Sequence, residues 1–463
     1  MKDNEKLRTA IAAFIWIAVW LAGAMLVHNE LLLPGPLTTL KTLGTLALTG
    51  VFYINIAWTV ARCLIAMIVS FFAGAFFAWL SYRRYWARKI ASLPVGFFKA
   101  VPVMAIIIYV ILIAQADWVA IIVCFLMCFP IVYTNILAGL DAMPAEYLEL
   151  ARVYRLTTGQ KLRHIYLPGI IPQIKSAISL IAGLSWKAVV AAEILSVPKY
   201  SLGYEMMNAK YYLQTPTLFA YIVVIVVLSM AFERLIKAAL NHIEWHSYEG
   251  GRIHLHAKAD EAGVATATSK TELKNVSKSY ENKLVFDGLN LEPESGKVTS
   301  LMGPSGQGKT TVARLLAGLE KADSGEVSAP ENVAFLFQED RLLPWLNVRD
   351  NIALARLGKG AGEDADARIR QLAVEFEIED VLNRLPEELS GGMKHRVAMA
   401  RTFFAEGELV ILDEPFRGLD AALKDRIVGR LWERETAGRT VILITHAAGD
   451  AEGLADETIS MQG

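Results

Sequence analysis

Cysteine is scarce in this chain of 463 residues, with Cys63, Cys124 and Cys128 as its three examples, all in apolar stretches. So few thiols exclude a secreted disulfide scaffold, and the absence of a CxxC pair disfavours a zinc site. We interpret the three cysteines as small core residues. With 54% hydrophobic and 20% charged residues, the chain is too apolar for an ordinary soluble enzyme and too charged to lie wholly in a membrane.

Acidic residues are sparse in the first half of the chain. Residues 1–250 hold 20 Lys and Arg against 12 Asp and Glu, whereas residues 251–463 hold 26 against 35. This split excludes a single soluble domain, and nucleic-acid binding is disfavoured because the basic excess lies between apolar runs. We therefore predict a transmembrane domain over 1–245, a linker over 246–270 and a charged globular domain over 271–463.

Six apolar stretches in the first half predict membrane-spanning helices. Four of them contain no charge over 19 to 23 residues, which matches the ~20 residues needed to cross the hydrocarbon core. Of the two weaker stretches, one is interrupted by Pro102 and the other holds Lys187 and Glu193. The predicted spans are Thr9–Val27, Cys63–Tyr82, Ala100–Ala116, Trp118–Leu140, Ser176–Val197 and Tyr211–Phe232.

The distribution of basic residues orients these spans. With six spans and a cytoplasmic start, the cytoplasmic segments 1–8, 83–93 and 141–175 hold twelve Lys and Arg, against Lys41, Lys199 and Lys210 outside, as the positive-inside rule requires. Both termini, and with them the globular domain, are then expected in the cytoplasm.

Charges inside the predicted spans need an explanation. Lys187 lies near the centre of the fifth span, where a charge costs at least ~2.5–3.5 kcal/mol on insertion scales. Two interpretations stay open: Lys187 and Glu193 belong to a pathway that attracts an anionic solute, or Lys187 pairs with Glu193 or extends to the interface. Arg62, near the start of the second span, is interpreted as extending to the interface.

The second half contains a phosphate-binding loop between a predicted strand, Val298–Met302, and a predicted helix, Val312–Leu319. Its GxxxxGK[ST] pattern allows backbone N–H groups to surround phosphates, with Lys309 at the β- and γ-phosphates and the Thr310 hydroxyl on Mg²⁺. The pattern, which GTPases and guanylate-type kinases share, predicts a site for a nucleoside triphosphate and Mg²⁺ formed by Gly303, Pro304, Ser305, Gly306, Gln307, Gly308, Lys309, Thr310 and Thr311.

Two further segments supply matching chemistry. The apolar strand from Leu409 ends in two carboxylates, of which Asp413 is expected at Mg²⁺ and Glu414 as the general base that polarises the attacking water. A helix begins after Ser390, Gly391 and Gly392, whose N–H groups and hydroxyl can hold an anion.

The segment Leu389–Met393 resembles the LSGGQ signature of ATP-binding cassettes, with Met393 in place of the final Gln. The resemblance implies that Gln338 is the Q-loop residue, at the γ-phosphate and Mg²⁺, and that His446 is the switch histidine. It also implies that Tyr280 stacks on adenine. The fold it implies is an all-α polytopic membrane domain of six transmembrane helices, followed by an α/β P-loop ATPase domain with a helical subdomain.

Between the fourth and fifth spans lies a polar segment that resembles the coupling loop of cassette-driven importer permeases, a helical hairpin that docks on the ATPase. Glu149 and Ala151 match its start, and Leu167 and Pro168 match its end. Arg155 stands where that family usually has Gly, so the geometry of the turn is expected to differ.

Finer motifs are similar to importers of nitrate, sulfonates and taurine, among them Phe337–Trp345 and Ala191–Glu193. This resemblance implies ATP-driven import of a small, anionic solute across a bacterial inner membrane, with a separate solute-binding protein. It also implies a C₂ homodimer, because the signature of one cassette serves the P-loop of the other. A half-exporter and a membrane-tethered regulatory ATPase that does not transport are the alternatives.

Overall fold

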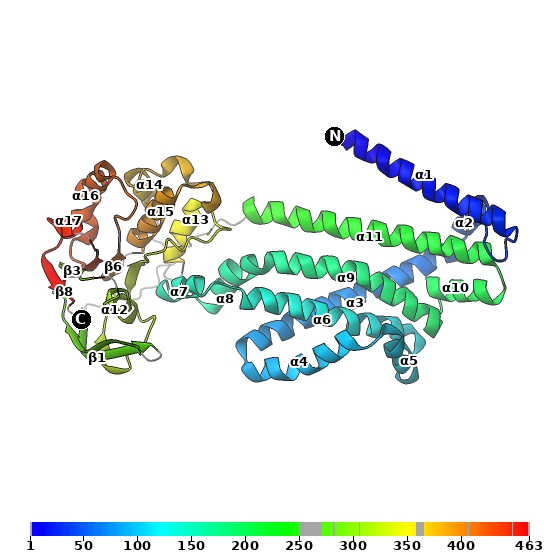
Figure 1. The fold of residues 1–463 in the computed structure, drawn as a ribbon, viewed down its shortest axis with the longest axis horizontal. Coiled ribbons are helices and arrows are strands. Elements are labelled where there is room, and N and C mark those ends of the chain that lie inside the picture. Colours follow the sequence, from blue (N-terminus) through cyan, green and yellow to red (C-terminus); the bar gives the residue numbers. More distant parts are fainter. Residues whose placement is uncertain are drawn as a thin grey trace. The chain divides into compact units, whose positions relative to one another are not determined.

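The structure, a computed structural model, describes residues 2–249, 253, 270–280, 283–304, 306–357, 365–405, 407–446 and 448–461. The chain forms two compact units (Figure 1). The first unit comprises residues 1–142 and 170–244, and the second unit comprises residues 143–169 and 245–463. The second unit is therefore built from two separate stretches of the chain.

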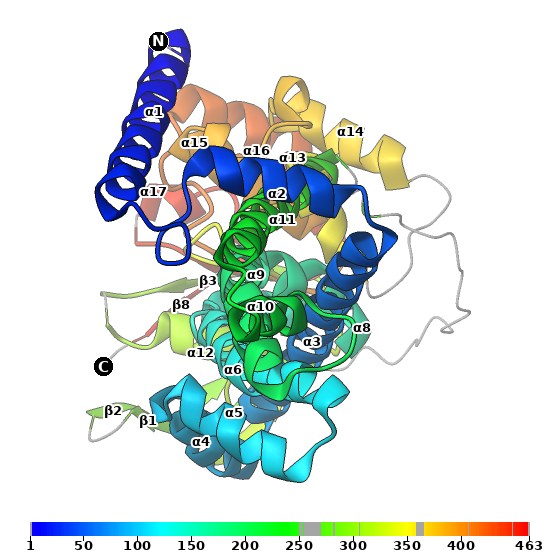
Figure 2. The ribbon, with the colours of Figure 1, turned by 90° about the vertical axis from the view of Figure 1, so that its right-hand side faces the viewer.

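The described part of the first unit consists of helices joined by short connections, as its long apolar runs predict. Its helices α3 and α6 run side by side, as seen in Figure 1 and, from the adjacent side, in Figure 2. The elements are α1 Lys2–Val27, α2 Pro36–Ala47, α3 Gly50–Arg83, α4 Tyr85–Ala100, α5 Val103–Ile113, α6 Ala116–Asp141, most of α9 Leu167–Ser196, α10 Leu202–Tyr211 and α11 Thr215–Glu249.

Among the described residues, four helices are long and apolar enough to cross a membrane: α3, α6, α11 over Thr215–Asn241, and the continuous helix Thr158–Ser196. The pair α4 and α5, bent by 108° around Pro102, would make a fifth. The apolar part of α1, Phe14–Val27, is shorter. A multi-pass helical membrane domain is thus confirmed, while the count of six spans stays a prediction.

Close packing joins α3 to α6. A Cβ added at Gly74 would lie 2.7 Å from the Cβ of Val132, so this contact needs a glycine, as helix pairs in membranes often do. The three cysteines are free and buried in the same unit, which confirms their interpretation as core residues.

The interpretation of Arg62 is wrong. Its side chain is 4% exposed, and its guanidinium donates to Glu193 Oε1 at 3.0 Å and to Asp117 Oδ1 at 3.1 Å instead of extending into solvent. Glu193 is fully buried and also accepts a hydrogen bond from Thr59. Arg62 is therefore the ion-pair partner of Glu193, and the pairing of Lys187 with Glu193 is wrong. Lys187 lies exposed on α9.

The second unit begins with α7 Ala145–Val153, α8 Thr158–Lys161 and the π-helical turn η1 Leu162–Tyr166. The C-terminal stretch then adds two sheets and their helices. Its elements are β1 Glu272–Tyr280, β2 Lys283–Leu291, β3 Val298–Met302, α12 Lys309–Leu316, β4 Ser324–Ser328, β5 Val333–Leu336, α13 Val348–Ala353, η2 Leu354–Arg356, α14 Ala365–Glu375, η3 Glu379–Val381, η4 Pro386–Glu388, α15 Gly391–Phe404, β6 Leu409–Asp413, α16 Ala421–Thr436, β7 Thr440–Ile444, α17 Ala448–Ala451 and β8 Glu457–Ser460.

The larger sheet is parallel, with strand order β5-β6-β7-β3-β8. Its central strands are continuous apolar runs because they are buried on both faces. The smaller sheet is antiparallel, in the order β2-β1-β4. Four of these strands, β5, β6, β7 and β3, are consecutive neighbours. The segments that follow their carboxyl ends therefore lie together at one edge of the sheet, which is where ligands bind in open α/β sheets.

Residues 143–169, which we call the coupling segment, share the hydrophobic core of the second unit. Leu150, Ala151 and Tyr154 are fully buried in the same cluster as the strands of the parallel sheet. Within the predicted linker, α11 continues to Glu249 and Ile253 is buried with its N–H on Asp350 Oδ1 at 3.3 Å. The remainder of that prediction, apart from Lys270, lies outside the described residues.

Candidate functional site

A cavity of about 370 Å³ lies at the carboxyl edge of the parallel sheet. We call it the P-loop cavity, because the loop before α12 forms one side of it. It brings together residues from five segments of the sequence: Tyr280, Lys283, Val285, Gly306, Gly308, Lys309, Thr310, Thr311, Gln338, Asp413, Glu414, Ile444 and His446.

The P-loop adopts a backbone that requires glycine. Gly306 and Gly308 have φ values of +85° and +84°, and a Cβ at Gly308 would approach Val285 Cγ1 to 2.5 Å. Gly308 is the residue that precedes the first turn of α12, so backbone N–H groups of that turn are available to an anion. Ser305 lies outside the described residues.

Lys309 is the first residue of α12, and its side chain is 5% exposed. Its ammonium donates to the carbonyl oxygens of Gly303 at 2.6 Å and Pro304 at 2.8 Å. Burial lowers the pKa of Lys309. Gln307 has a buried side-chain oxygen without a hydrogen-bond partner.

Thr310 and Asp413 form the oxygen pair that Mg²⁺ would need. The Thr310 hydroxyl donates to Asp413 Oδ2 at 3.0 Å, and the Asp413 carboxyl is 2% exposed. Burial raises the pKa of Asp413 to about 6, and a cation held at this carboxylate would lower its pKa again. Among the described residues, no group of three His, Cys, Asp or Glu could hold a metal by itself. This fits Mg²⁺, which usually takes one or two carboxylates together with substrate phosphates.

Glu414 follows directly and faces His446. Glu414 has φ +54°, a left-handed conformation that costs a non-glycine residue about 1–3 kcal/mol. Its N–H donates to the Ile444 carbonyl at 2.9 Å, and its Oε1 lies 2.9 Å from His446 Nε2. The strained backbone therefore directs this carboxylate into the cavity beside the histidine, as a general base requires.

Gln338 and Tyr280 form the outer part of the P-loop cavity. Gln338 follows β5 and is exposed, and Arg417 donates to its carbonyl oxygen at 3.3 Å. Tyr280 is 42% exposed, and its hydroxyl is hydrogen-bonded to Glu320. The Lys278 ammonium lies over its ring, 5.4 Å from the centroid, and an aromatic ring of this kind can stack on a base. Thr311, on α12, is buried behind it.

The signature segment lies elsewhere on the second unit. Ser390 caps α15, and its hydroxyl accepts a hydrogen bond from the Met393 N–H at 3.3 Å. Ser390 and Gly391 are exposed and Gly392 is half-buried, and none of the three lines the P-loop cavity.

Glu149 connects the coupling segment to two parts of the nucleotide site. Its carboxylate accepts two hydrogen bonds from Arg314, at 2.6 and 3.1 Å, and one from Arg341 at 2.7 Å. Arg314 lies on α12, the helix that begins at Lys309, and Arg341 lies three residues after Gln338. The hydrogen bonds from Arg314 are the main reason that the pKa of Glu149 is lowered.

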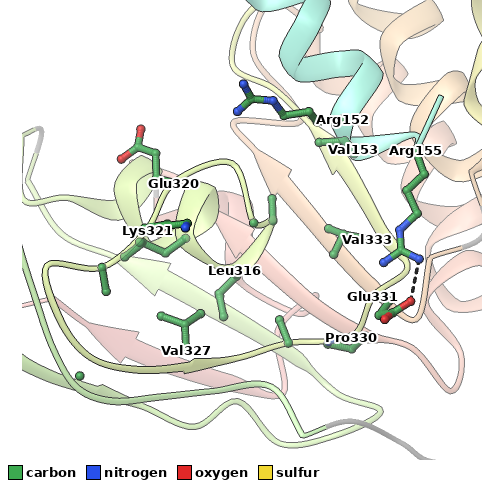
Figure 3. Close-up of a pocket in the computed structure, with 16 residues that line it drawn as sticks. Arg152, Val153, Arg155, Leu316, Glu320, Lys321, Val327, Pro330, Glu331 and Val333 are labelled. Carbon is green, nitrogen blue, oxygen red and sulfur yellow. Dashed lines mark hydrogen bonds and ion pairs between the residues drawn. The ribbon is translucent and has the colours of Figure 1, made fainter. Parts of the chain in front are cut away.

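The turn of the coupling segment forms in spite of Arg155. This residue takes φ +54°, the conformation that Gly would adopt without strain. Its guanidinium pairs with Glu331 at 2.8 Å (Figure 3). Leu167 is exposed and Pro168 is half-buried, and both directly follow the π-helical turn η1.

Sequence reasoning missed Arg314, Arg341 and His395. His395 is 5% exposed, with Nδ1 at 2.8 Å from Asp340 and Nε2 at 2.8 Å from the Pro415 carbonyl oxygen. The signal for Arg341 was its position three residues after Gln338. Nothing in the sequence pattern distinguishes Arg314 or His395 from an exposed polar residue.

Comparisons with known proteins agree with this geometry. The family model described as ABC transporter matches residues 286–417, and the model described as binding-protein-dependent transport system inner membrane component matches residues 70–243. The aliphatic sulfonates import ATP-binding protein SsuB 1 of Pseudomonas fluorescens is 40% identical over 191 residues, which are 41% of this chain and 71% of that protein.

Other relatives match the same region. SsuB 2 of Streptomyces avermitilis is 40% identical over 41% of this chain and 76% of its own length. The maltose/maltodextrin import ATP-binding protein MalK of Photorhabdus laumondii is 37% identical over 42% of this chain and 56% of its own length. A solved structure titled as the ATP binding subunit of an ABC transporter is 26% identical, covers 41% of this chain and 85% of its own, and has a TM-score of 0.39.

Proposed function

This chain belongs to the ATP-binding-cassette transporters, as an importer-type permease fused to its ATPase, and we propose that it imports a small sulfonate-like anion. The cassette hydrolyses ATP and thereby drives the import. We place the permease at 1–245, the linker at 246–270 and the cassette at 271–463. The multi-pass permease lies in the bacterial inner membrane, and the proposed orientation has both termini and the cassette in the cytoplasm.

The observation that carries this proposal is the position of Glu149. A carboxylate of the permease's coupling segment is held by one arginine from the P-loop helix and another from the segment after Gln338. Any movement of these two nucleotide-binding segments is therefore transmitted directly to the coupling segment. In this proposal the Glu149 contact couples hydrolysis to the permease, and its bidentate geometry and partial shielding from water support that role.

The residues of the P-loop cavity divide the chemistry among them. The α12 N-terminus and Lys309 bind the phosphates, and Tyr280 receives the adenine on its ring. Glu414 orients and deprotonates the attacking water, while His446 contacts Glu414 and the γ-phosphate. Thr310, Asp413 and Gln338 are the residues that would hold Mg²⁺, which neutralises charge on the β- and γ-phosphates when bound.

Two copies of the chain complete the site in this proposal. The signature residues Ser390 to Gly392 do not line the P-loop cavity of their own chain, yet they offer an exposed N–H cluster at a helix start. A C₂ homodimer lets each signature close the other chain's nucleotide site. The Glu414→Gln variant should bind ATP without hydrolysing it and should elute as a dimer with Mg-ATP in light scattering. A single copy at saturating Mg-ATP would contradict the dimer.

The match to a binding-protein-dependent permease favours import over the two alternatives. Import in this class requires a separate solute-binding protein to deliver the solute.

The solute class rests on the sulfonate-import relatives. Because a maltose-import cassette is also similar, likeness of the cassette alone does not select the solute. Reconstituted protein should therefore be tested with its binding protein, alkanesulfonate, taurine and maltose as solutes, and ATP on the cassette side. Inward, ATP-dependent uptake of a sulfonate, abolished in Glu414→Gln, is expected. Outward transport, or uptake of maltose alone, would contradict the proposal.

Lys187 remains the proposed pathway residue, whereas Glu193 is committed to Arg62. In the described part of the chain, Lys187 has no ion pair and lies exposed on α9. An exposed ammonium within a membrane helix is favourable only beside water or an anion. Lys187→Met should therefore reduce sulfonate uptake and leave basal hydrolysis intact; unchanged uptake would exclude this role.

A further inference from the structure

A buried histidine of the second unit has no part in the chemistry described above. His395 lies on α15, the helix that begins at the signature segment, and is 5% exposed. Its Nδ1 lies 2.8 Å from Asp340 Oδ1, and its Nε2 lies 2.8 Å from the Pro415 carbonyl oxygen. Asp340 comes two residues after Gln338, and Pro415 directly follows Glu414. One side chain of the signature helix therefore contacts two segments that each carry a residue of the P-loop cavity.

Both partners of the His395 ring are hydrogen-bond acceptors. A carboxylate and a carbonyl oxygen supply no proton, so the ring makes both hydrogen bonds only when each of its nitrogens carries one. The charged ring then makes charge-assisted hydrogen bonds, which are stronger than neutral ones. Pro415 has no N–H, so its carbonyl oxygen is the backbone group through which it can be held. His395 therefore attaches the signature helix to two loops by directional bonds.

The attachment at Pro415 bears on the strained backbone of Glu414. A non-glycine residue at φ +54° costs about 1–3 kcal/mol and persists only where its surroundings fix it. The Glu414 N–H donates to the Ile444 carbonyl at 2.9 Å, and the carbonyl of the next residue, Pro415, is bonded to His395. The chain is thus fixed both before and after the strained residue, and this sets the direction of the Glu414 carboxylate.

The segment after Gln338 is held by the same helix. Arg341 also has a left-handed backbone, with φ +47°. The carbonyl oxygens of Asp340 and Arg341 accept hydrogen bonds at 2.6 and 2.9 Å from Arg401, a residue of α15 that is 1% exposed. Arg401 bonds this segment, whereas His395 bonds both this segment and the one that follows Glu414. His395 is therefore the side chain that joins the two loops to each other and to the signature helix.

We propose that His395 is a positioning residue for ATP hydrolysis, which fixes Gln338 and Glu414 relative to the signature helix. This role deepens the function proposed above and rests on the assignment of Glu414 as the general base. His395 does not line the P-loop cavity, so it sets the direction of reacting groups and does not bind the phosphates. Loss of the ring should therefore lower kcat and leave the affinity for ATP close to its normal value.

The test measures steady-state hydrolysis of Mg-ATP by the full-length protein in phosphatidylcholine nanodiscs, and ATP affinity without Mg²⁺. Each rate is divided by the amount of protein that binds ATP, so that misfolded protein does not count. His395→Ala should lower kcat by about 10- to 100-fold, while the Kd for ATP changes by less than about threefold. The matched control is Thr402→Val, at a buried residue of the same helix whose hydroxyl donates to the Ala398 carbonyl; it should keep the parental kcat.

The His395→Gln variant tests the hydrogen bonds themselves. Its amide N–H can donate to the Pro415 carbonyl, but its amide oxygen then faces the Asp340 carboxylate, which is also an acceptor. Adding Asp340→Asn supplies an N–H for that oxygen. The double variant should therefore regain at least about fivefold of the kcat that His395→Gln loses, and Asp340→Asn alone completes the cycle. If the ring merely filled space, the second substitution would restore nothing.

Three results would each overturn the role of His395: a parental kcat for His395→Ala, a change confined to ATP affinity, or no recovery in the double variant. Glu414→Gln is measured in the same assay to separate this role from the function on which it rests. Hydrolysis at the parental rate by Glu414→Gln would mean that the assignment of the general base fails. If Glu414→Gln is inactive while His395→Ala keeps the parental kcat, the role of His395 alone fails. The solute that the permease carries affects neither result.

Discussion

Replacing Glu149 by Gln tests the contact on which coupling depends. The variant keeps the size and one acceptor oxygen of the side chain but removes its charge. Arg314 retains Glu320 as an ion-pair partner. Arg341 has no other carboxylate partner among the described residues, and its side chain is 10% exposed. The main loss therefore falls on Arg341, which becomes an unpaired, largely buried cation.

The size of the free-energy loss follows from the burial of Arg341. Breaking a fully buried ion pair costs about 3–5 kcal/mol, and a single charged hydrogen bond contributes about 1.5–3 kcal/mol. Since Glu149 itself is 19% exposed, we expect Glu149→Gln to weaken docking of the coupling segment on the cassette by about 2–4 kcal/mol. This corresponds to a roughly 30- to 1,000-fold shift of the docking equilibrium. For a unit of this size the melting temperature should fall by roughly 4–15 °C.

The assay compares Glu149→Gln with Glu146→Gln, a change on the same helix α7 at an exposed glutamate. In thermal unfolding of the full-length protein, the melting temperature should fall by the amount given above for Glu149→Gln and by less than about 1 °C for Glu146→Gln. In proteoliposomes, Glu149→Gln should retain basal hydrolysis while ATP-driven uptake is lost. Equal melting temperatures, or uptake in proportion to hydrolysis, would refute the role of this carboxylate.

Four further results are expected. Because Arg314 lowers the pKa of Glu149, the stabilisation by this pair is complete above the ordinary glutamate pKa and is lost as pH falls through the lowered value; acid unfolding of Glu149→Gln should lack this component. Arg155→Gly relieves left-handed strain but removes an exposed ion pair of about 0–1 kcal/mol, so its melting temperature should stay within about 3 °C of the parent. Glu193→Gln should destabilise the first unit by about 3–5 kcal/mol, and Arg62→Met combined with Glu193→Leu should recover part of this loss in denaturation experiments in detergent. Thr310→Ala should lower ATP turnover at least ~100-fold and raise the Mg²⁺ concentration needed for half-maximal rate.

The P-loop cavity was predictable because its residues follow the ends of buried strands. The strand Val298–Met302 has its predicted bounds, and the strand from Leu409 ends one residue earlier than predicted, at Asp413. A parallel sheet brings these ends together wherever the strands are neighbours. Local pattern therefore predicted the phosphate-binding loop and the carboxylates Asp413 and Glu414, whereas Gln338, His446 and Tyr280 were predicted from the resemblance to ATP-binding cassettes.

The buried ion pairs were not predictable in the same way. Counting charge-free residues placed the start of the second span at Cys63, whereas α3 begins at Gly50 and continues through Arg62. The charge is tolerated because Glu193, 131 residues later, lies beside it. Likewise Arg314 and Arg341 are 165 and 192 residues from Glu149. Neither helical nor strand periodicity contains information about partners at such separations.

The second unit is a discontinuous domain whose smaller piece is inserted between two membrane helices. Leu150, Ala151, Tyr154 and Ile165 complete its hydrophobic core, so an ATPase fragment cut from residue 271 onward would expose the apolar surface that they cover. Gene fission at the linker would therefore separate two pieces of one folded body. Keeping both on a single polypeptide holds their local concentration high and their stoichiometry fixed at one to one.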